Sequence, residues 1–196
     1  KSLGLRSWSD ASARDLELIE RSCSGYFSNN PYDRWFKKLD QVVVGTGSSF
    51  YSALYPACHL DLIPYATAVK WMDLQHSDRR QLLDLCADAL GLLLRESRIR
   101  VLLLNGRTVV SQFEEAAGLT LDEVDMPAWS LPRTSGRDVS GKAHIGKIST
   151  FAGVSLEREV LVLGYNHNLQ SSFGVTNQAI RGIRDWIANT CAEVLR

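Results

Sequence analysis

Apolar residues recur every three or four positions in five stretches of the chain, the spacing typical of amphipathic helices. The pattern predicts helices over residues 10–27, 32–44, 77–96, 108–117 and 175–195. Ser9 and Asp10 favour the start of the first helix, and Gly118 ends the fourth. In three stretches the side chains expected to face a core share this spacing: Trp35, Leu39 and either Val42 or Val43; Leu82, Leu85, Cys86, Ala89, Leu92 and Leu93; Ile180, Ile183, Ile187 and Val194.

Shorter apolar runs predict β-strands over residues 59–65, 100–106, 145–152 and 159–165. The second run has four consecutive apolar residues and ends at Asn105-Gly106, which indicates a central parallel strand buried on both faces. Residues 122–141 contain several Gly and Pro, and we expect them to form a long loop or an excursion at a sheet edge.

Strands and helices alternate along the chain, which is the order typical of α/β proteins. We therefore expect an α/β fold: a three-layer α/β/α sandwich around a central, mostly parallel sheet. No internal repeat divides the chain, and 196 residues are enough to bury one core. The sequence predicts a single domain over residues 1–196.

Composition and charge exclude several classes of protein. The chain is 45% hydrophobic and 22% charged, which excludes a disordered tail, a collagen-like repeat and a disulfide miniprotein. Its 22 basic residues balance 22 acidic residues, so the formal net charge is zero. No overall basic field therefore points to nucleic acid, although a local patch can still bind it.

The four cysteines, at positions 23, 58, 86 and 191, lie far apart, without a C-x-x-C pair or a nearby histidine at metal-ligand spacing. We expect reduced thiols, no metal site and a cytoplasmic protein. No apolar run approaches the roughly 20 residues that span a bilayer, and the first residues do not have a signal-peptide pattern. We therefore expect no membrane partner.

Polar residues follow three of the predicted strands, at 59–67, 104–107 and 165–172. In an open α/β sheet, ligands bind just beyond the carboxyl ends of the strands. Together the three endings supply a carboxylate, a neutral amide, an imidazole and a loop rich in Ser and Gln. This set suits a polar heterocycle and phosphate oxygens, which Ser, Gln and Asn contact without positive charge.

The order of these endings resembles that of the uracil-DNA glycosylase superfamily. The family's Leu-Asn-x-x-Pro strand is similar to His59-Leu60-Asp61-Leu62-Ile63-Pro64-Tyr65, and its Leu-Leu-x-Gly strand is similar to Val101-Leu102-Leu103-Leu104-Asn105-Gly106. Its last strand, where a histidine heads a loop that enters the duplex, is similar to Tyr165-Asn166-His167-Asn168-Leu169-Gln170-Ser171-Ser172. A helix with a late Trp186 follows, as in the family. The resemblance covers residues 32–190 in order, and each motif alone is weak.

Two features differ from the family pattern. His167 is followed by Asn168-Leu169 where the family usually has His-Pro-Ser, so the Leu lies closer to the His. The first motif, which normally holds the Asp or Asn that activates water, has two candidate positions. It is either Asn30-Pro31, which follows a helical stretch instead of a strand, or a segment upstream of Lys1. The cysteine spacing does not match the iron–sulfur members, so we expect no cluster.

The resemblance implies an enzyme that binds DNA, flips a damaged or modified base out of the duplex and hydrolyses its N-glycosidic bond without a cofactor or metal. Its purpose would be DNA repair, or defence against phage DNA with modified bases. The implied catalytic residues are His167, which stabilises charge on the departing base, together with Asp61 and Asn30. Leu169 would fill the vacated space in the duplex. The other implied contacts are Phe50 or Tyr51 stacked on the base, Asn105 or Asp61 on its polar edge, and Asn166, Asn168, Gln170, Ser171, Ser172 and Arg107 on the DNA around it.

Each of these residues also has a structural interpretation: His167 as a surface residue, Asp61 as a cap, Asn105 as part of a turn, and Phe50-Tyr51 as core. Two other functions stay open. One is a non-catalytic nucleic-acid-binding module on the same fold; the other is an α/β hydrolase using His167, which the missing Gly-x-Ser-x-Gly motif disfavours. The glycosylase requires the three endings to converge on one pocket, with Leu169 protruding beside it. We expect a monomer.

Overall fold

The computed structural model describes residues 12–29, 31–63, 69–133 and 136–194. Its helices within these ranges are α1 (Ala13–Ser24), α2 (Tyr26–Asn29), α3 (Asp33–Val43), η2 (Val44–Thr46), η3 (Trp71–Asp73), α4 (His76–Glu96), α5 (Arg107–Ala117), η4 (Pro127–Trp129) and α6 (Asn177–Val194), where η marks a 3-10 helix. Its strands are β1 (Val101–Asn105), β2 (Asp122–Asp125), β3 (Lys142–Phe151) and β4 (Val154–Tyr165). Within these ranges, no helix has both the length and the apolar character needed to cross a bilayer.

The four strands form one mixed sheet in the order β1-β4-β3-β2. β1 and β4 are parallel, whereas β3 pairs antiparallel with both β4 and β2. The predicted α/β class is therefore confirmed. The predicted mostly parallel sheet is wrong, because one of the three pairs in the described sheet is parallel. β3 and β4 are joined by Ala152-Gly153 with φ values of 46° and 79°, and so tight a hairpin turn joins only antiparallel neighbours.

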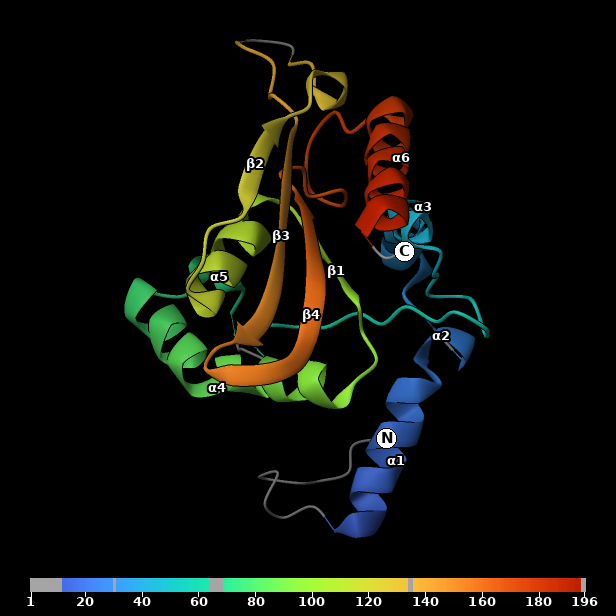
Figure 1. Cartoon of the computed structure of the whole chain (residues 1–196), viewed down its shortest axis with the longest axis vertical. Coiled ribbons are helices and arrows are strands. Elements are labelled where there is room, and N and C mark those ends of the chain that lie inside the picture. Colours follow the sequence, from blue (N-terminus) through green and yellow to red (C-terminus); the bar gives the residue numbers. More distant parts are fainter. Residues whose placement is uncertain (1–11, 30, 64–68, 134–135, 195–196) are drawn as a thin grey trace.

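Two helical layers cover the two faces of the sheet, as the sandwich prediction requires (Figure 1). On one face α3 and α6 pack on Leu161, Leu163 and Tyr165 of β4. On the other face α4 and α5 pack on Val160 and Val162 of the same strand. Because β4 is buried on both faces, it is the strand with the consecutive apolar run typical of a sheet interior. β1, predicted to be central, lies at the sheet edge instead.

The helices form where periodicity predicts them, but two of them face the core with other residues. In α3, Phe36 is buried while Trp35, predicted to be inward, is 37% exposed. In α4, Leu83, Cys86 and Leu94 are buried, whereas Leu85, Leu92 and Leu93 are exposed.

The orientation of α4 has a physical cause in Gly91. Apolar residues occupy most positions from 82 to 94, so the pattern alone does not select a face. A Cβ on Gly91 would lie 2.7 Å from the Phe151 carbonyl oxygen. The missing side chain therefore lets α4 approach the β3–β4 hairpin through this position.

The strand predicted over 59–65 is absent from its described part, residues 59–63. Leu60 and Leu62 pack against the α4–α5 core instead of joining the sheet. The rest of that prediction, residues 64–65, lies outside the described residues. The single helix predicted over 10–27 is two helices in the described part: Ser12 caps α1 in a reciprocal capping box with Asp15, and α1 ends at Gly25.

A substitution at Gly45 tests how closely the α3–η2 segment approaches α6. A Cβ at this position would lie 2.5 Å from the Arg184 carbonyl oxygen and 3.2 Å from Ile187. We expect Gly45→Ala to lower the free energy of unfolding by about 1–3 kcal/mol, because the new methyl group forces two packed backbones apart. Gln41→Ala, on the exposed side of α3, is the matched control in urea unfolding. A Gly45→Ala variant as stable as the control would show that this approach is wrong.

Candidate functional site

The carboxyl ends of β1 and β4 lie side by side because these strands are parallel, with Asn105 opposite Tyr165. The segment after β4, residues 166–176, which we call the β4–α6 loop, contacts the start of α5. The Gly106 N–H donates to the Tyr165 carbonyl at 2.9 Å, and the Arg107 N–H donates to the Asn166 carbonyl at 3.0 Å. Two of the three predicted strand endings therefore meet at one end of the sheet.

The Asn105 carboxamide connects β1 to the β4–α6 loop. Its Oδ1 accepts from the Leu169 N–H at 3.1 Å, and its Nδ2 donates to Oε1 of Gln170 at 2.7 Å. A backbone N–H only donates, so the first bond fixes the orientation of the Asn105 amide and then that of the Gln170 amide. As a result, Nε2 of Gln170 is buried and has no hydrogen-bond partner among the described residues. An unpaired buried donor costs free energy until an acceptor reaches it.

Asn168 shapes the turn that follows. Its Oδ1 accepts from the N–H groups of Gln170 and Ser171, both at 3.0 Å, and its carbonyl accepts from Ser172 at 2.8 Å. This is an Asx turn, in which a side chain replaces a backbone acceptor. Gly106, with φ of 104°, packs against Asn168, and a Cβ there would lie 2.9 Å from the Cβ of Asn168. Gly106 is therefore required both for its backbone angle and for this contact.

Asn166 fastens the loop to the start of β3. Its Oδ1 accepts from the Lys142 N–H at 2.9 Å, and its Nδ2 donates to the Ser140 carbonyl at 2.8 Å. The carboxamides of Asn166 and Asn168, which the resemblance places on DNA, are thus engaged inside the protein. The carboxamides of Asn105, Asn166 and Asn168 together hold the β4–α6 loop in this conformation.

His167 is 1% exposed and faces η4, not an open cleft. Its Nε2 lies 2.8 Å from the Trp129 carbonyl, which only accepts, so Nε2 carries the proton. Burial lowers the pKa of His167, so the ring is neutral at pH 7. Because this bond is to a carbonyl and not to a hydroxyl or thiol, the contact gives no support to a nucleophilic hydrolase.

The prediction that Leu169 protrudes is wrong: its side chain is 0% exposed and lies in the α3–α6 core. The bond from its N–H to Asn105 holds the backbone in the position that turns the side chain inward. The exposed apolar residue of this loop is Phe173, at 68% exposure. Sequence reasoning missed Phe173, although an aromatic residue directly after Ser171-Ser172 in a polar loop was the available signal. Arg107 and Ser171 are also exposed.

Phe50 and Tyr51 belong to an aromatic cluster beside α2 and α3. Phe50 is buried and stacks on Phe27, with ring centroids 4.8 Å apart. The Tyr51 hydroxyl donates to Oδ1 of Asp33 at 2.9 Å. Burial, followed by this hydrogen bond to Asp33, raises the pKa of Tyr51 to about 12. The face of the Phe50 ring is already occupied, which is the arrangement of a core residue.

Asp61 is not brought to this end of the sheet. Asp61 is exposed and lies beside Leu90 and Leu93 of α4. That helix packs against the other end of β4, since a Cβ on Gly91 would lie 2.9 Å from the Cβ of Val154. The expected convergence of three endings is therefore wrong for residues 59–63, the described part of the ending that contains Asp61. Asn30 lies outside the described residues.

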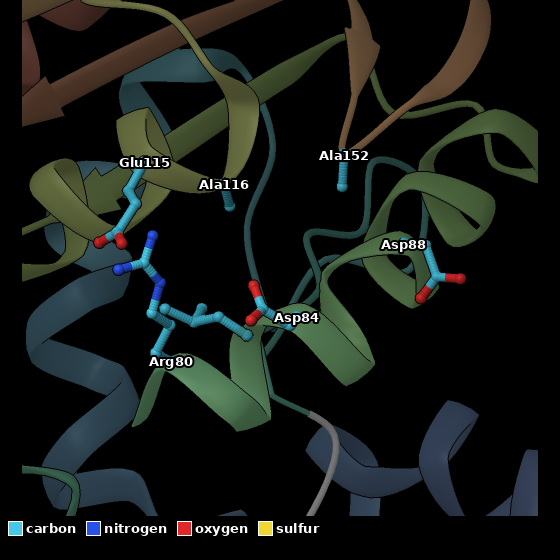
Figure 2. Close-up of a pocket in the computed structure, with 7 residues that line it drawn as sticks. Arg80, Asp84, Asp88, Glu115, Ala116 and Ala152 are labelled. Carbon is cyan, nitrogen blue, oxygen red and sulfur yellow. The ribbon is translucent and has the colours of Figure 1, made fainter. Parts of the chain in front are cut away.

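One hollow in the surface has no residue of the β4–α6 loop in its lining (Figure 2). It has a volume of about 400 Å³ and lies between α4, α5 and the β3–β4 turn. Arg80 and Glu115 extend toward one another across it, and Asp84 lies beside them (Figure 2). A second hollow is lined by His59, Asp61 and α4. Neither contains a residue of the β4–α6 loop. Among the described residues, no cluster of three or more His, Cys, Asp or Glu is arranged to hold a metal ion.

Comparison with protein-family models, curated proteins and solved structures finds no match for this chain. Its function is therefore argued from the arrangement of its own residues.

Asn105→Ala tests the connection between β1 and the β4–α6 loop. The substitution leaves the Leu169 N–H and the Gln170 carboxamide without partners, so we expect a loss of about 1–3 kcal/mol in the free energy of unfolding. Asn105→Asp retains the acceptor, and rotation of the Gln170 amide then lets its Nε2 donate; we expect a smaller loss. Asn189→Ala is the same change on the exposed side of α6. Its free energy of unfolding should stay within about 0.5 kcal/mol of the wild-type value. Equal losses at Asn105 and Asn189 in urea unfolding would contradict the connection.

The buried state of His167 predicts a pH dependence. The native chain keeps the ring neutral because burial lowers its pKa, whereas the unfolded chain protonates it near pH 6.5, so stability falls as the pH drops below about 6.5. His167→Gln keeps an N–H near Nε2 but does not titrate. We expect it to reduce the slope of unfolding free energy against pH by up to about 1.4 kcal/mol per pH unit in this window. Some slope should persist, because burial also lowers the pKa of His144. An unchanged slope would show that His167 is not buried as a neutral ring.

Proposed function

We propose that this chain is a DNA glycosylase that takes a base out of DNA and hydrolyses its N-glycosidic bond. The observation that carries the proposal is the joining of Asn105 to Leu169-Gln170 at the carboxyl ends of the parallel pair β1–β4. These are two of the elements that resemble the uracil-DNA glycosylase superfamily, and their position is the usual place for a ligand in an α/β sheet.

The surface beside this junction has features suited to a DNA backbone. Arg107 and Ser171 are exposed there, and α5 begins at Gly106, which provides no side-chain cap. The Arg107 N–H already donates to the Asn166 carbonyl, so the N–H groups of Thr108 and Val109 are the ones that a phosphate could meet. Free N–H groups in the first turn of a helix favour an anion. Phe173 takes the role first expected of Leu169, because an exposed aromatic ring can occupy the space left by a flipped base.

The polar groups nearest the junction suit a base that presents a hydrogen-bond acceptor. Nε2 of Gln170 is a buried donor without a partner among the described residues, and one N–H of Asn105 Nδ2 remains after its bond to Gln170. A carbonyl oxygen on the base edge would satisfy a donor of this kind. The proposal therefore favours substrates with an accessible carbonyl, which include uracil, hypoxanthine and modified cytosines.

In the proposed reaction a water molecule adds to the sugar carbon, the C–N bond breaks, and the base departs with the bonding electron pair before it takes up a proton. His167 would stabilise the departing base as a neutral N–H donor. This requires Nε2 to exchange the Trp129 carbonyl for the base, and DNA binding would open the β4–α6 loop enough for that exchange. We place the reaction in the cytoplasm, in DNA repair or in defence against modified phage DNA. The four free cysteines, two exposed and two buried, support a reducing compartment.

One observation favours a second candidate function, a nucleic-acid-binding module without catalysis. In the described chain His167 and Asn166 are both hydrogen-bonded within the protein, and Asp61 lies at the other end of β4. A binding module would use the α5 start, Arg107 and Phe173 and would need no group to activate water.

The test is incubation with single- and double-stranded DNA that contains uracil, hypoxanthine, or hydroxymethylated or glucosylated cytosine, followed by alkali to reveal abasic sites. We expect abasic product from the wild type on at least one base. Asn105→Ala and His167→Ala should each lower the rate about 100-fold, the scale for removal of one positioned group, while Gln81→Ala on exposed α4 should not. Circular dichroism of each variant separates this loss from unfolding.

Two other outcomes decide between the functions. DNA affinity without abasic product on any base would establish the binding module. If the protein neither binds DNA nor forms abasic product, both proposed functions and the family resemblance are overturned.

A further inference from the structure

Helix α4 carries two apolar stripes, and the core of the protein covers one of them. The inward stripe consists of the half-buried Leu90 and the buried Leu83, Cys86 and Leu94. With 3.6 residues per turn, Leu92 points to the side of the helix opposite Leu94. The residues on that side are also apolar, and we call them the outer stripe of α4: Leu82, Leu85, Ala89, Leu92 and Leu93.

The outer stripe is open to solvent along most of its length. Leu85 is 68% exposed, Leu92 is 41% exposed and Leu93 is 45% exposed; Ala89 is exposed and Leu82 is half-buried. The steps from Leu82 to Leu92 are three, four and three residues, the spacing of the positions in a coiled coil that pack against another helix. The stripe runs for about 16 Å, or three turns of helix. A continuous exposed apolar stripe of this kind is typical of an interaction surface.

A hollow lies on each side of the outer stripe. On one side, Asp84 and Asp88 of α4 line the hollow that reaches Glu115 of α5 (Figure 2). On the other side, Ala89 and Leu93 line the hollow that contains residues 59–61. The stripe is therefore a ridge between two hollows. A helix laid along the ridge could cover its leucines and extend long side chains into the hollow on each side.

Both hollows are acidic. Their linings contain four carboxylates, those of Asp61, Asp84, Asp88 and Glu115, and among the described residues a single guanidinium, that of Arg80. None of the four carboxylates forms an ion pair within the described ranges. Charge complementarity therefore favours an occupant with basic side chains along both edges of its apolar face.

This charge pattern disfavours three other occupants. An antiparallel second copy that pairs Leu82 with Leu92 brings the two Asp88 side chains together beside the symmetry axis, and like charges there are repulsive. The chain's own helix α1 (Ala13–Ser24) has three acidic and two basic residues, so it does not complement an acidic surface. An anionic lipid surface would be repelled by the carboxylates on both sides of the stripe.

We propose that the outer stripe of α4 binds an amphipathic helix of another protein, with apolar residues on one face and Lys or Arg along both edges of that face. The apolar face covers the leucines, and the basic side chains reach the carboxylates in the two hollows. This surface includes neither a residue of the β4–α6 loop nor Arg107, and it does not depend on glycosylase activity.

The stripe can be tested on the full chain by fluorescence anisotropy with a labelled peptide of three Lys-Leu-Ala-Ala-Leu-Lys-Ala repeats, which we call the lysine peptide. Leu85→Ser combined with Leu92→Ser removes two exposed leucines and should weaken binding about tenfold or more. Leu54→Ser, the same change at a residue that is 84% exposed elsewhere, should leave the affinity within about twofold. Circular dichroism of each variant checks that the fold is retained.

The charges are tested with a peptide in which every lysine is replaced by glutamate. The wild type should bind this glutamate peptide about tenfold more weakly than the lysine peptide. Asp84→Lys combined with Asp88→Lys should reverse that preference, while Asp122→Lys on the exposed β2 should not.

Methyl NMR then locates the contact. The lysine peptide should shift the methyl resonances of Leu85 and Leu92 and leave those of the buried Leu94 in place. Shifts confined to other methyl groups, equal binding of the two peptides, or no binding at millimolar concentration would overturn the proposal. A wild-type dimer that the double serine variant dissociates would show instead that a second copy covers the stripe.

Discussion

The two hydrogen bonds of the Asn105 carboxamide join residues 64 and 65 positions apart in the chain, and the candidate site depends on them. They fix the backbone of Leu169, which turns that side chain into the core, and they set the Gln170 amide so that its Nε2 is left unpaired. Asn168 and Asn166 then fasten the rest of the loop to itself and to β3. Most polar groups of this region therefore hold the loop in place. The few that remain unpaired are the ones available to a ligand.

β4 supports this arrangement because it is covered on both faces by helices. Leu161 and Leu163 contact one layer, and Val160 and Val162 contact the other. Gly164 allows α5 to come close, since a Cβ there would lie 2.9 Å from Val110. The loop that follows β4 therefore starts from a rigid strand, which is the condition for placing functional groups accurately on a loop.

The same packing leaves one polar group unpaired at the carboxyl end of the sheet. Nε2 of Gln170 is buried there without a hydrogen-bond partner among the described residues. Arg107 at the start of α5 and Phe173 of the β4–α6 loop are exposed. These are the groups that we propose for contact with a base and its phosphates.

The sequence by itself determined where the longer helices lie and three of the four predicted strands, because periodicity and apolar runs reflect local burial. Tertiary structure alone decided which face of α4 is inward, since only the contact of Gly91 with the hairpin distinguishes its apolar positions. It also placed β1 at an edge, separated Asp61 from Asn105 and buried His167 and Leu169. These outcomes depend on contacts between residues distant in the chain, and no local pattern of polarity encodes which distant partner a side chain will meet.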